Sequence, residues 1–550
     1  MIKKKIIENL LTVFATVGAC VVLSSCISVD NGSIEDRIGP GTMSSFSAMT
    51  EKEITPPGNH KTTPTVKPEG PIAVTVQGAI LMALENNRAL KVEKFNPAIL
   101  RTAEEEERSV FDPVLSGGYS QFREKSEKLS RPNLENLNNE INSELSVSEY
   151  FPTGTDIGID MSIDQSWSNL YSNDLYASRM GLSITQTLLR GAGLNYNLAR
   201  LRQARLSTRA SAYELRGFAE TLVAQIEETY WDYALTQRQI KIFLDSLNLA
   251  EQQKDETEEM IRIGVLAESE LAASEAEIAL RREGLINARS NLDKTRLQIL
   301  RLLNPPDTNL WQREVILLHE PKVPDVKLDE VESHVGVALR MRQDLNQARL
   351  QVQMGDLEIV RTKNGLLPKM DFFINLGKTG YAGSFGNSVR DIDGDYYDIL
   401  AGVSLEYPFI NRKAQAKHRK SLLSRKQTEE AMKNLVQLVQ VDVRSAYIEA
   451  NRAKEQIAAT AATRVFQKEK ARIETEKFRV GKSTTLLVAQ AQRDLLSSRI
   501  TEIQAIANYL KALTELYRLE GSLLERRGIM APGRKSVLNN AYTSGSAQYE

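Results

Sequence analysis

The sequence is poor in cysteine and aromatic residues and carries almost no net charge. Cys20 and Cys26 are its only cysteines, and both lie in the first 26 of 550 residues. A chain cleaved at that point can form no internal disulfide and no thiolate metal cluster. Lys and Arg number 70 against 71 Asp and Glu. Because this balance offers no basic surface that would wrap nucleic acid, we expect no nucleic-acid partner.

Motifs of catalysis are also missing. The four histidines show no metal-ligand spacing and are expected on the surface: His60, His319, His334 and His418. The segment Gly481-Lys482-Ser483-Thr484 resembles the end of a phosphate-binding loop, but that motif requires a glycine where Glu476 stands. We therefore predict that the chain is not an enzyme and has no catalytic residue, no cofactor and no metal site.

The N-terminal residues predict export from the cytoplasm. Three lysines, residues 3–5, precede an apolar run at 10–22 that is too short to span a bilayer. Leu23-Ser24-Ser25-Cys26 then resembles a bacterial lipobox, which makes Cys26 the predicted lipidation site. Lipidation of Cys20 and ordinary cleavage are the alternatives. A single acyl chain would serve as an auxiliary tether, because one such anchor holds only marginally.

The rest of the chain consists of two similar copies of one unit between flexible ends. Ala83-Leu84-Glu85-Asn86-Asn87 recurs as Ala338-Leu339-Arg340-Met341-Arg342, and Gly264 recurs as Gly481. The expected organisation is a signal peptide with lipobox at 1–26, a flexible linker at 27–73, a first repeat at 74–304, a connector at 305–327, a second repeat at 328–526 and a disordered tail at 527–550.

Each copy contains segments in which apolar and polar residues alternate. Four alternate positions of the second copy are apolar: Met370, Phe372, Ile374 and Leu376. Such strands suit either a soluble sheet or the wall of a transmembrane barrel, with lipid outside and water inside. The export signal favours the barrel. We place the strands at about 113–189 and about 369–409.

Each copy also predicts a long helical hairpin, at about 195–303 and about 413–525. Residues 198–261 contain one glycine and no proline, and residues 414–478 contain neither. Helices of about 64 residues would be roughly 95 Å long. The hairpin tips are expected at Gly264 and Gly481, because glycine adopts the positive φ that ends a helix and reverses the chain.

One chain does not supply enough strands for a membrane barrel. A sheet edge in lipid leaves backbone N–H and C=O groups unpaired at several kcal/mol each, so a membrane sheet must close. Barrels begin at about eight strands, and a water-filled pore needs more. The strand count therefore predicts that several chains each contribute one sector.

The order of these features resembles the TolC-like outer-membrane efflux protein family over about residues 74–526. The motifs that carry the resemblance are Ala83-Leu84-Glu85-Asn86-Asn87, Leu188-Leu189-Arg190-Gly191-Ala192-Gly193, Leu366-Leu367-Pro368-Lys369-Met370, Tyr407-Pro408-Phe409, and Ala489-Gln490-Ala491 after the second tip glycine. The resemblance implies a mixed α/β membrane protein with two tandem structural repeats per chain. It would form a homotrimer with a 12-stranded outer-membrane β-barrel, continued by a long periplasmic α-helical coiled-coil barrel.

The same resemblance implies partners at the hairpin tips. A periplasmic adaptor and an inner-membrane pump would engage this end of the molecule, with Ile263, Gly264, Val480 and Gly481 facing the adaptor. The alternative for the two glycines is that they merely permit the turn.

The chain departs from the family pattern in two places. Where some members carry an acidic ring after the second tip glycine, this chain has Leu487 and Gln490. Glu268 and Glu270 near the first tip are possible replacements, although they also suit a solvated helix face. The first copy also has a long insertion with alternating segments. We expect four strands per chain with the extra pair in a surface loop; six strands would give a barrel of 18.

The predicted function is that of the outer-membrane channel of a tripartite efflux or type I secretion system in a Gram-negative-type bacterium. Such a channel is a passive duct, and the partner pump supplies the energy and selects the cargo. The alternative is a periplasmic coiled-coil scaffold lipoprotein without a pore. A scaffold of that kind has no need of the alternating strands.

Overall fold

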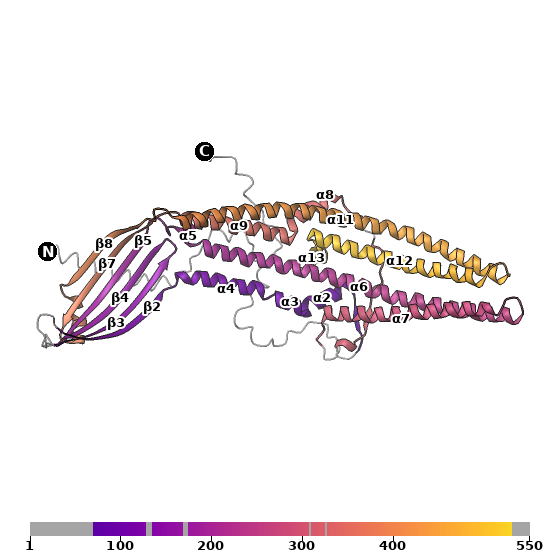
Figure 1. Ribbon diagram of the computed structural model, residues 1–550, viewed down its shortest axis with the longest axis horizontal. Coiled ribbons are helices and arrows are strands. Elements are labelled where there is room, and N and C mark those ends of the chain that lie inside the picture. Colours follow the sequence, from indigo (N-terminus) through magenta and orange to yellow (C-terminus); the bar gives the residue numbers. More distant parts are fainter. Residues whose placement is uncertain (1–69, 128–134, 169–173, 307–309, 325–326, 531–550) are drawn as a thin grey trace, which may run out of the picture. The chain divides into compact units, whose positions relative to one another are not determined.

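Two long helical hairpins and one antiparallel sheet account for most of the chain (Figure 1). The computed structural model describes residues 70–127, 135–168, 174–306, 310–324 and 327–530. These residues all fall within one unit of the chain, residues 67–550. None of the described helices is both long enough and apolar enough to cross a bilayer.

The hairpins are α6 (Ala199–Arg262) with α7 (Ser269–Leu303), and α11 (Arg412–Arg479) with α12 (Thr485–Glu520). Their sequences are rich in Leu, Ala, Arg, Gln and Glu, which are strong helix formers. Asn304, with φ of 40°, ends α7 just before two prolines. Gly521, with φ of 73°, ends α12 in the same left-handed conformation.

Shorter helices accompany the two hairpins, and one in each copy continues the line of the return leg toward the sheet. The first copy has α2 (Val76–Asn86), α3 (Arg88–Glu93), α4 (Asn96–Arg108) and α5 (Leu194–Asn197), and the second has α8 (Val331–Met341), α9 (Gln343–Asn364) and, after α12, α13 (Leu523–Arg526). Four helices therefore lie side by side at each level. Their order is α11, α9, α6, α4 beside the sheet and α11, α12, α6, α7 toward the hairpin tips.

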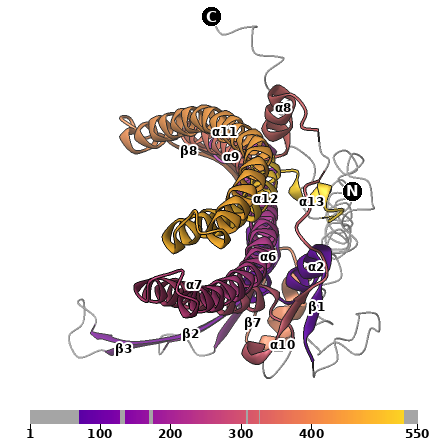
Figure 2. The same cartoon turned by 90° about the vertical axis from the view of Figure 1, so that its right-hand side faces the viewer.

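This helical layer is curved. In the view along the hairpins, the long helices form an arc, and α2, α8 and α13 lie on its convex side (Figure 2). The strand pair β1 (Ile72–Val74) and β6 (Val315–Leu317) lies near α2, on the same side. The concave side faces the direction from which Figure 1 is viewed. A curved layer of this kind closes into a tube when copies stand side by side around an axis.

The sheet has six strands in the order β2-β3-β4-β5-β7-β8, and all neighbours are antiparallel. Their bounds are Val114–Glu127, Glu135–Phe151, Thr155–Ser168, Leu175–Thr187, Lys369–Ala382 and Tyr397–Glu406. The expectation of four strands is therefore wrong. The long insertion in the first copy is not a surface loop, because β3 and β4 pair with each other and with both flanking strands along their length.

The main hydrophobic core lies where α6 meets α2, α12 and the end of α7. Two tyrosines of α6 fasten the small parallel strand pair to it. The Tyr230 hydroxyl lies 3.3 Å from the Val74 carbonyl oxygen, and the Tyr233 hydroxyl donates to the Val315 carbonyl at 3.0 Å. Segments expected to be linker and connector thus contribute strands to this core.

Two further expectations differ from the structure. His334 is not on the surface: it is buried on α8, and its Nδ1 lies 3.2 Å from a carboxylate oxygen of Glu520. The first residues of the expected tail are also placed, because Arg527 pairs with Glu227 at 2.5 Å and Ile529 packs against the main core. The remaining tail, residues 531–550, and His60 lie outside the described residues.

Candidate functional site: channel wall and hairpin tips

One face of the sheet is apolar across all six strands. The pairing register brings one row of apolar side chains together, one from each strand: Leu115, Val147, Ile159, Leu182, Leu376 and Ile399. The alternation seen in the sequence places further apolar residues of each strand on this same face, because side chains two apart share a face. The apolar residues thus form a continuous band over the sheet.

The opposite face is polar and carries an ion-pair bridge. Arg179 on β5 lies 2.9 Å from Asp160 on β4 and 2.9 Å from Asp398 on β8. Gly181 and Gly377 make room for its guanidinium, since a Cβ at Gly377 would lie 2.6 Å from Arg179 Nη2. Sequence reasoning did not single out this bridge, because its members come from three strands and only the sheet register brings them together.

The strands are long enough to cross a membrane, and the sheet is open. They contain 10 to 17 residues, whereas a tilted strand needs about 9 to 11 to span the hydrocarbon core. The edge strands β2 and β8 each pair on one side only among the described residues. Each edge therefore presents a row of backbone groups that a further strand can satisfy.

The two hairpin tips share one turn geometry. Gly264 has φ of 80° and Gly481 has φ of 72°. In the first tip, the Val265 N–H donates to the Met260 carbonyl at 2.9 Å, and the second tip repeats this bond from Lys482 to Lys477 at 2.8 Å. Each glycine N–H also donates to the carbonyl three residues earlier at 2.9 Å, and the two bonds together form a Schellman motif, which satisfies the last helical carbonyls.

The apolar side chains beside the tip glycines point into solvent. Ile263 is 63% exposed and Val480 is 67% exposed. Nothing lies within 4 Å of the position that a Cβ would take at either glycine. The sequence placed these four residues at the tips, and the structure brings the two tips to the same end of the helical layer (Figure 1).

Charged residues near the tips link the two hairpins. Arg479 of α11 lies 2.8 Å from Glu256 of α6, a pair that the sequence did not suggest. Glu268 is exposed and Glu270 is half-buried, and neither forms an ion pair with a described residue. Leu487 is exposed on α12.

The described residues include neither a candidate metal site nor the predicted lipidation site. No group of three or more His, Cys, Asp or Glu side chains among them is arranged to hold a metal ion. The predicted lipidation site, Cys26, and its alternative, Cys20, lie outside the described residues.

Part of the second copy matches a known protein family, and most of the chain has a known fold. Residues 335–522 match the family model described as "Outer membrane efflux protein". The outer-membrane channel OprN superposes with a TM-score of 0.60 at 16% identity, covering 81% of this chain and 90% of that chain. No curated protein matches the chain in sequence.

Two further solved outer-membrane channels have the same fold. The Campylobacter jejuni CmeC outer membrane channel gives a TM-score of 0.60 at 14% identity, covering 85% of this chain and 93% of that one. The Neisseria gonorrhoeae MtrE outer membrane channel gives 0.59 at 17% identity, covering 82% and 89%. Part of the second copy thus matches the outer membrane efflux protein family, and most of the chain has the fold of these solved outer-membrane channels.

Proposed function

We propose that the chain is the outer-membrane channel of a tripartite efflux system. It would act as a passive duct that takes substrates from an inner-membrane pump and a periplasmic adaptor and conducts them across the outer membrane. The observation that carries this proposal is the two-faced six-stranded sheet, which is joined directly to a curved layer of long helices. Efflux is preferred to type I secretion because the matching family model is described by efflux.

The sheet argues against a scaffold without a pore. A spacer would need only the coiled-coil helices, whereas this chain carries a continuous apolar row on one face and an Arg–Asp bridge on the other. An apolar face of this size is stable in lipid and is an aggregation hazard in water. A polar face on the other side suits a water-filled lumen.

Three chains would close the barrel with 18 strands. In this arrangement β2 of one copy pairs with β8 of the next, which removes both open edges. Barrel diameter grows roughly linearly with strand number, so the barrel would be about half as wide again as one of 12 strands. Barrels of 16 to 18 strands leave an aqueous channel.

The hairpin tips would bind the periplasmic adaptor. Ile263 and Val480 are exposed apolar side chains at equivalent positions of the two copies, so each chain presents two similar docking points. Three chains would present six around the tube. This pseudo-sixfold arrangement supplies equivalent surfaces to the hairpins of a repeated partner.

Membrane extraction tests the duct against the scaffold. We expect the processed protein to stay with outer membranes in high salt and in carbonate, and to be released only by detergent as an assembly of three chains. Release by salt or carbonate would contradict the proposal. An acyl anchor alone does not explain retention if a Cys26→Ala variant with a cleavable signal gives the same result.

A conductance measurement tests the pore itself. Purified protein is added to planar bilayers as the wild type and as Gly481→Pro, a change that the φ of 72° cannot accommodate and that therefore opens the tip turn. We expect discrete conductance steps that are larger in the variant. No conductance from either protein would refute the pore.

A further inference from the structure

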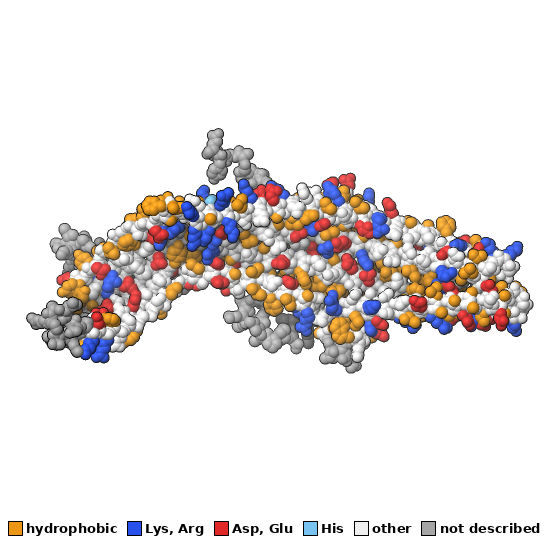
Figure 3. Space-filling model, in the orientation of Figure 1, with side chains coloured by type: hydrophobic (Ala, Val, Ile, Leu, Met, Phe, Trp, Pro, Cys, Tyr) orange, Lys and Arg blue, Asp and Glu red, His pale blue; other side chains and the backbone are white. Residues whose placement is uncertain are grey.

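A hollow of about 830 Å³ lies where the helical layer meets the sheet. Its walls come from the end of α4, the end of β3, the start of α6, the end of α9 and the start of α11. On the face shown in Figure 3, blue side chains gather over α9 and α11 beside the strands, whereas blue and red alternate farther along the helices. The basic residues that line the hollow are Arg190, Arg200, Arg361, Lys413, Lys417 and Lys420.

This hollow opens on the concave side of the layer. Figure 3 has the orientation of Figure 1, and that face is the one enclosed by the arc in Figure 2. In the proposed trimer the concave side faces the central axis, and the convex side faces outward. The basic cluster would therefore line the lumen and would not face lipid headgroups.

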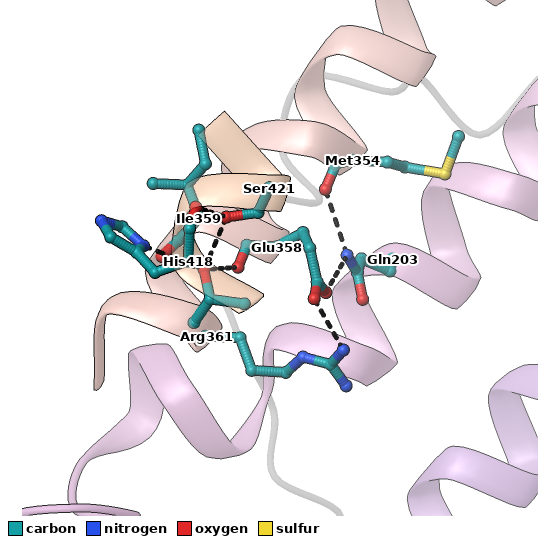
Figure 4. A network of polar contacts seen from close by, with 8 residues as sticks. Gln203, Met354, Glu358, Ile359, Arg361, His418 and Ser421 are labelled. Atoms are coloured by element: carbon teal, nitrogen blue, oxygen red, sulfur yellow. Dashed lines mark hydrogen bonds and ion pairs between the residues drawn. The ribbon is translucent and has the colours of Figure 1, made fainter. Parts of the chain in front are cut away.

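A polar network forms one wall of the hollow, and within it Arg361 and Glu358 neutralise each other (Figure 4). The Arg361 guanidinium donates to Glu358 at 2.8 Å, and Gln203 of α6 donates to the Met354 carbonyl at 3.1 Å and to Glu358 at 3.5 Å. Across the same wall, the Ser421 hydroxyl of α11 lies 2.8 Å from that of Thr362. The network joins α6, α9 and α11, so the hollow has a fixed backbone frame.

Most of the remaining cations have no carboxylate partner. Arg190 lies 3.7 Å from Glu406, but no carboxylate of the described residues lies within 4.0 Å of four others: Arg200, Lys413, Lys417 and Lys420. The three lysines are spaced four and three residues apart, which places them on one face of α11. Glu107 is the one lining carboxylate not already paired. The lining of the hollow, counted with Glu406, thus carries a surplus of three positive charges per chain.

We infer that this hollow is an anion-selecting station of the duct, whose three copies form a basic ring around the lumen and favour solutes that carry carboxylate or phosphate groups. The inference rests on the proposed channel function. Rings of Arg and Lys side chains select anions in pores because they raise the local anion concentration and repel cations. At 0.1 M salt such a ring acts over about 10 Å, and at 0.01 M over about 30 Å.

Ion selectivity in planar bilayers tests the inference. The bilayers are made of phosphatidylcholine alone, which removes anionic lipid as a source of the effect, and the probe is a tenfold KCl gradient across wild-type or Gly481→Pro channels. We expect a reversal potential with the sign of chloride preference, stronger near 0.01 M salt than near 1 M. Inorganic pyrophosphate on the tip side should reduce the chloride current severalfold.

Matched substitutions on one helix assign the effect to the hollow. The triple variant Lys413→Glu, Lys417→Glu, Lys420→Glu should reverse the sign of the reversal potential. The control carries the same change of charge on the same segment, at exposed residues that do not line the hollow: Arg412→Glu, Arg419→Glu and Lys426→Glu. This control should keep chloride preference. If the triple variant does not assemble, the same three lysines changed to Gln should still weaken chloride preference and pyrophosphate block.

The outcomes separate the two proposals. An unselective or potassium-selective wild-type conductance would overturn the anion station and leave the duct intact. Equal loss of selectivity in the control and lysine variants would also overturn it, since the effect would then belong to the whole helix. The absence of any conductance would instead refute the channel on which the inference depends.

Discussion

A buried cluster of charged side chains in the helical layer makes the stability of the protein depend on pH. Arg216 of α6 is fully buried, with Nη2 2.5 Å from Glu525 and Nε 3.3 Å from Glu220. Burial raises the pKa of Glu220 to about 7, although Arg216 opposes the shift. The folded protein thus binds a proton there that the unfolded chain releases near pH 4.5.

This proton makes stability depend on pH in a definite direction. Between pH 4.5 and 7 the unfolded state binds fewer protons at Glu220 than the folded state does, so stability falls as the pH rises through this window. The contribution is on the order of 3 kcal/mol. We expect the melting temperature in detergent, followed by circular dichroism, to fall from pH 5 to pH 8, and to fall less in Glu220→Gln. The exposed Asp255→Asn serves as the control; an unchanged slope in Glu220→Gln would exclude this explanation.

The ion-pair bridge on the polar face offers a second test. Arg179→Met leaves Asp160 and Asp398 without their shared cation, so the two carboxylates repel each other and the sheet loses about 1 kcal/mol. We expect a lower melting temperature for Arg179→Met. The triple variant that also carries Asp160→Asn and Asp398→Asn should recover most of the loss. No recovery would mean that Arg179 stabilises the wall through packing and not through charge.

Helix ends and strand pairs show how far the sequence carries a prediction. Gly264 and Gly481 were predicted as tips because helix termination is local: a glycine after a long apolar-periodic run suffices. The alternation in the insertion indicated six strands, but the family pattern favoured four; alternation shows which segments can be strands, and only the pairing of β3 with β2 and β4 shows that they join the sheet. The burial of His334 was likewise hidden, since Glu520 lies 186 residues away.

The tip turns allow their two roles to be separated. Ala at Gly264 or Gly481 meets no atom within 4 Å, so its effect is the backbone strain of a positive φ, about 1 kcal/mol. Ile263→Asp and Val480→Asp each change an exposed side chain and add no backbone strain, because the glycines are kept. We expect the Ala variants to lower the melting temperature slightly, and the Asp variants to abolish crosslinking to the adaptor at Lys482. Crosslinking that survives both Asp substitutions would show that the glycines only permit the turn.

At the scale of the whole molecule, the inserted β3–β4 hairpin would determine the barrel size of the proposed trimer. β2 ends and β5 begins at the same end of the sheet, so deletion of residues 128–173 would join two strands that already run antiparallel. We expect a trimer with 12 strands, about one third narrower at the barrel, visible by electron microscopy of detergent-solubilised protein. A barrel of unchanged diameter would contradict the 18-stranded arrangement.

The match between four helices abreast and six strands sets the bore of the duct. Helices packed 8–10 Å apart give each chain a width of roughly 32–40 Å in the tube. Six strands spaced about 4.8 Å and tilted by about 40° cover nearly the same width, about 38 Å, whereas four would cover only about 25 Å. In the proposed trimer the wall would therefore pass from helix to strand without a taper, and the membrane section would restrict cargo no more than the periplasmic section does.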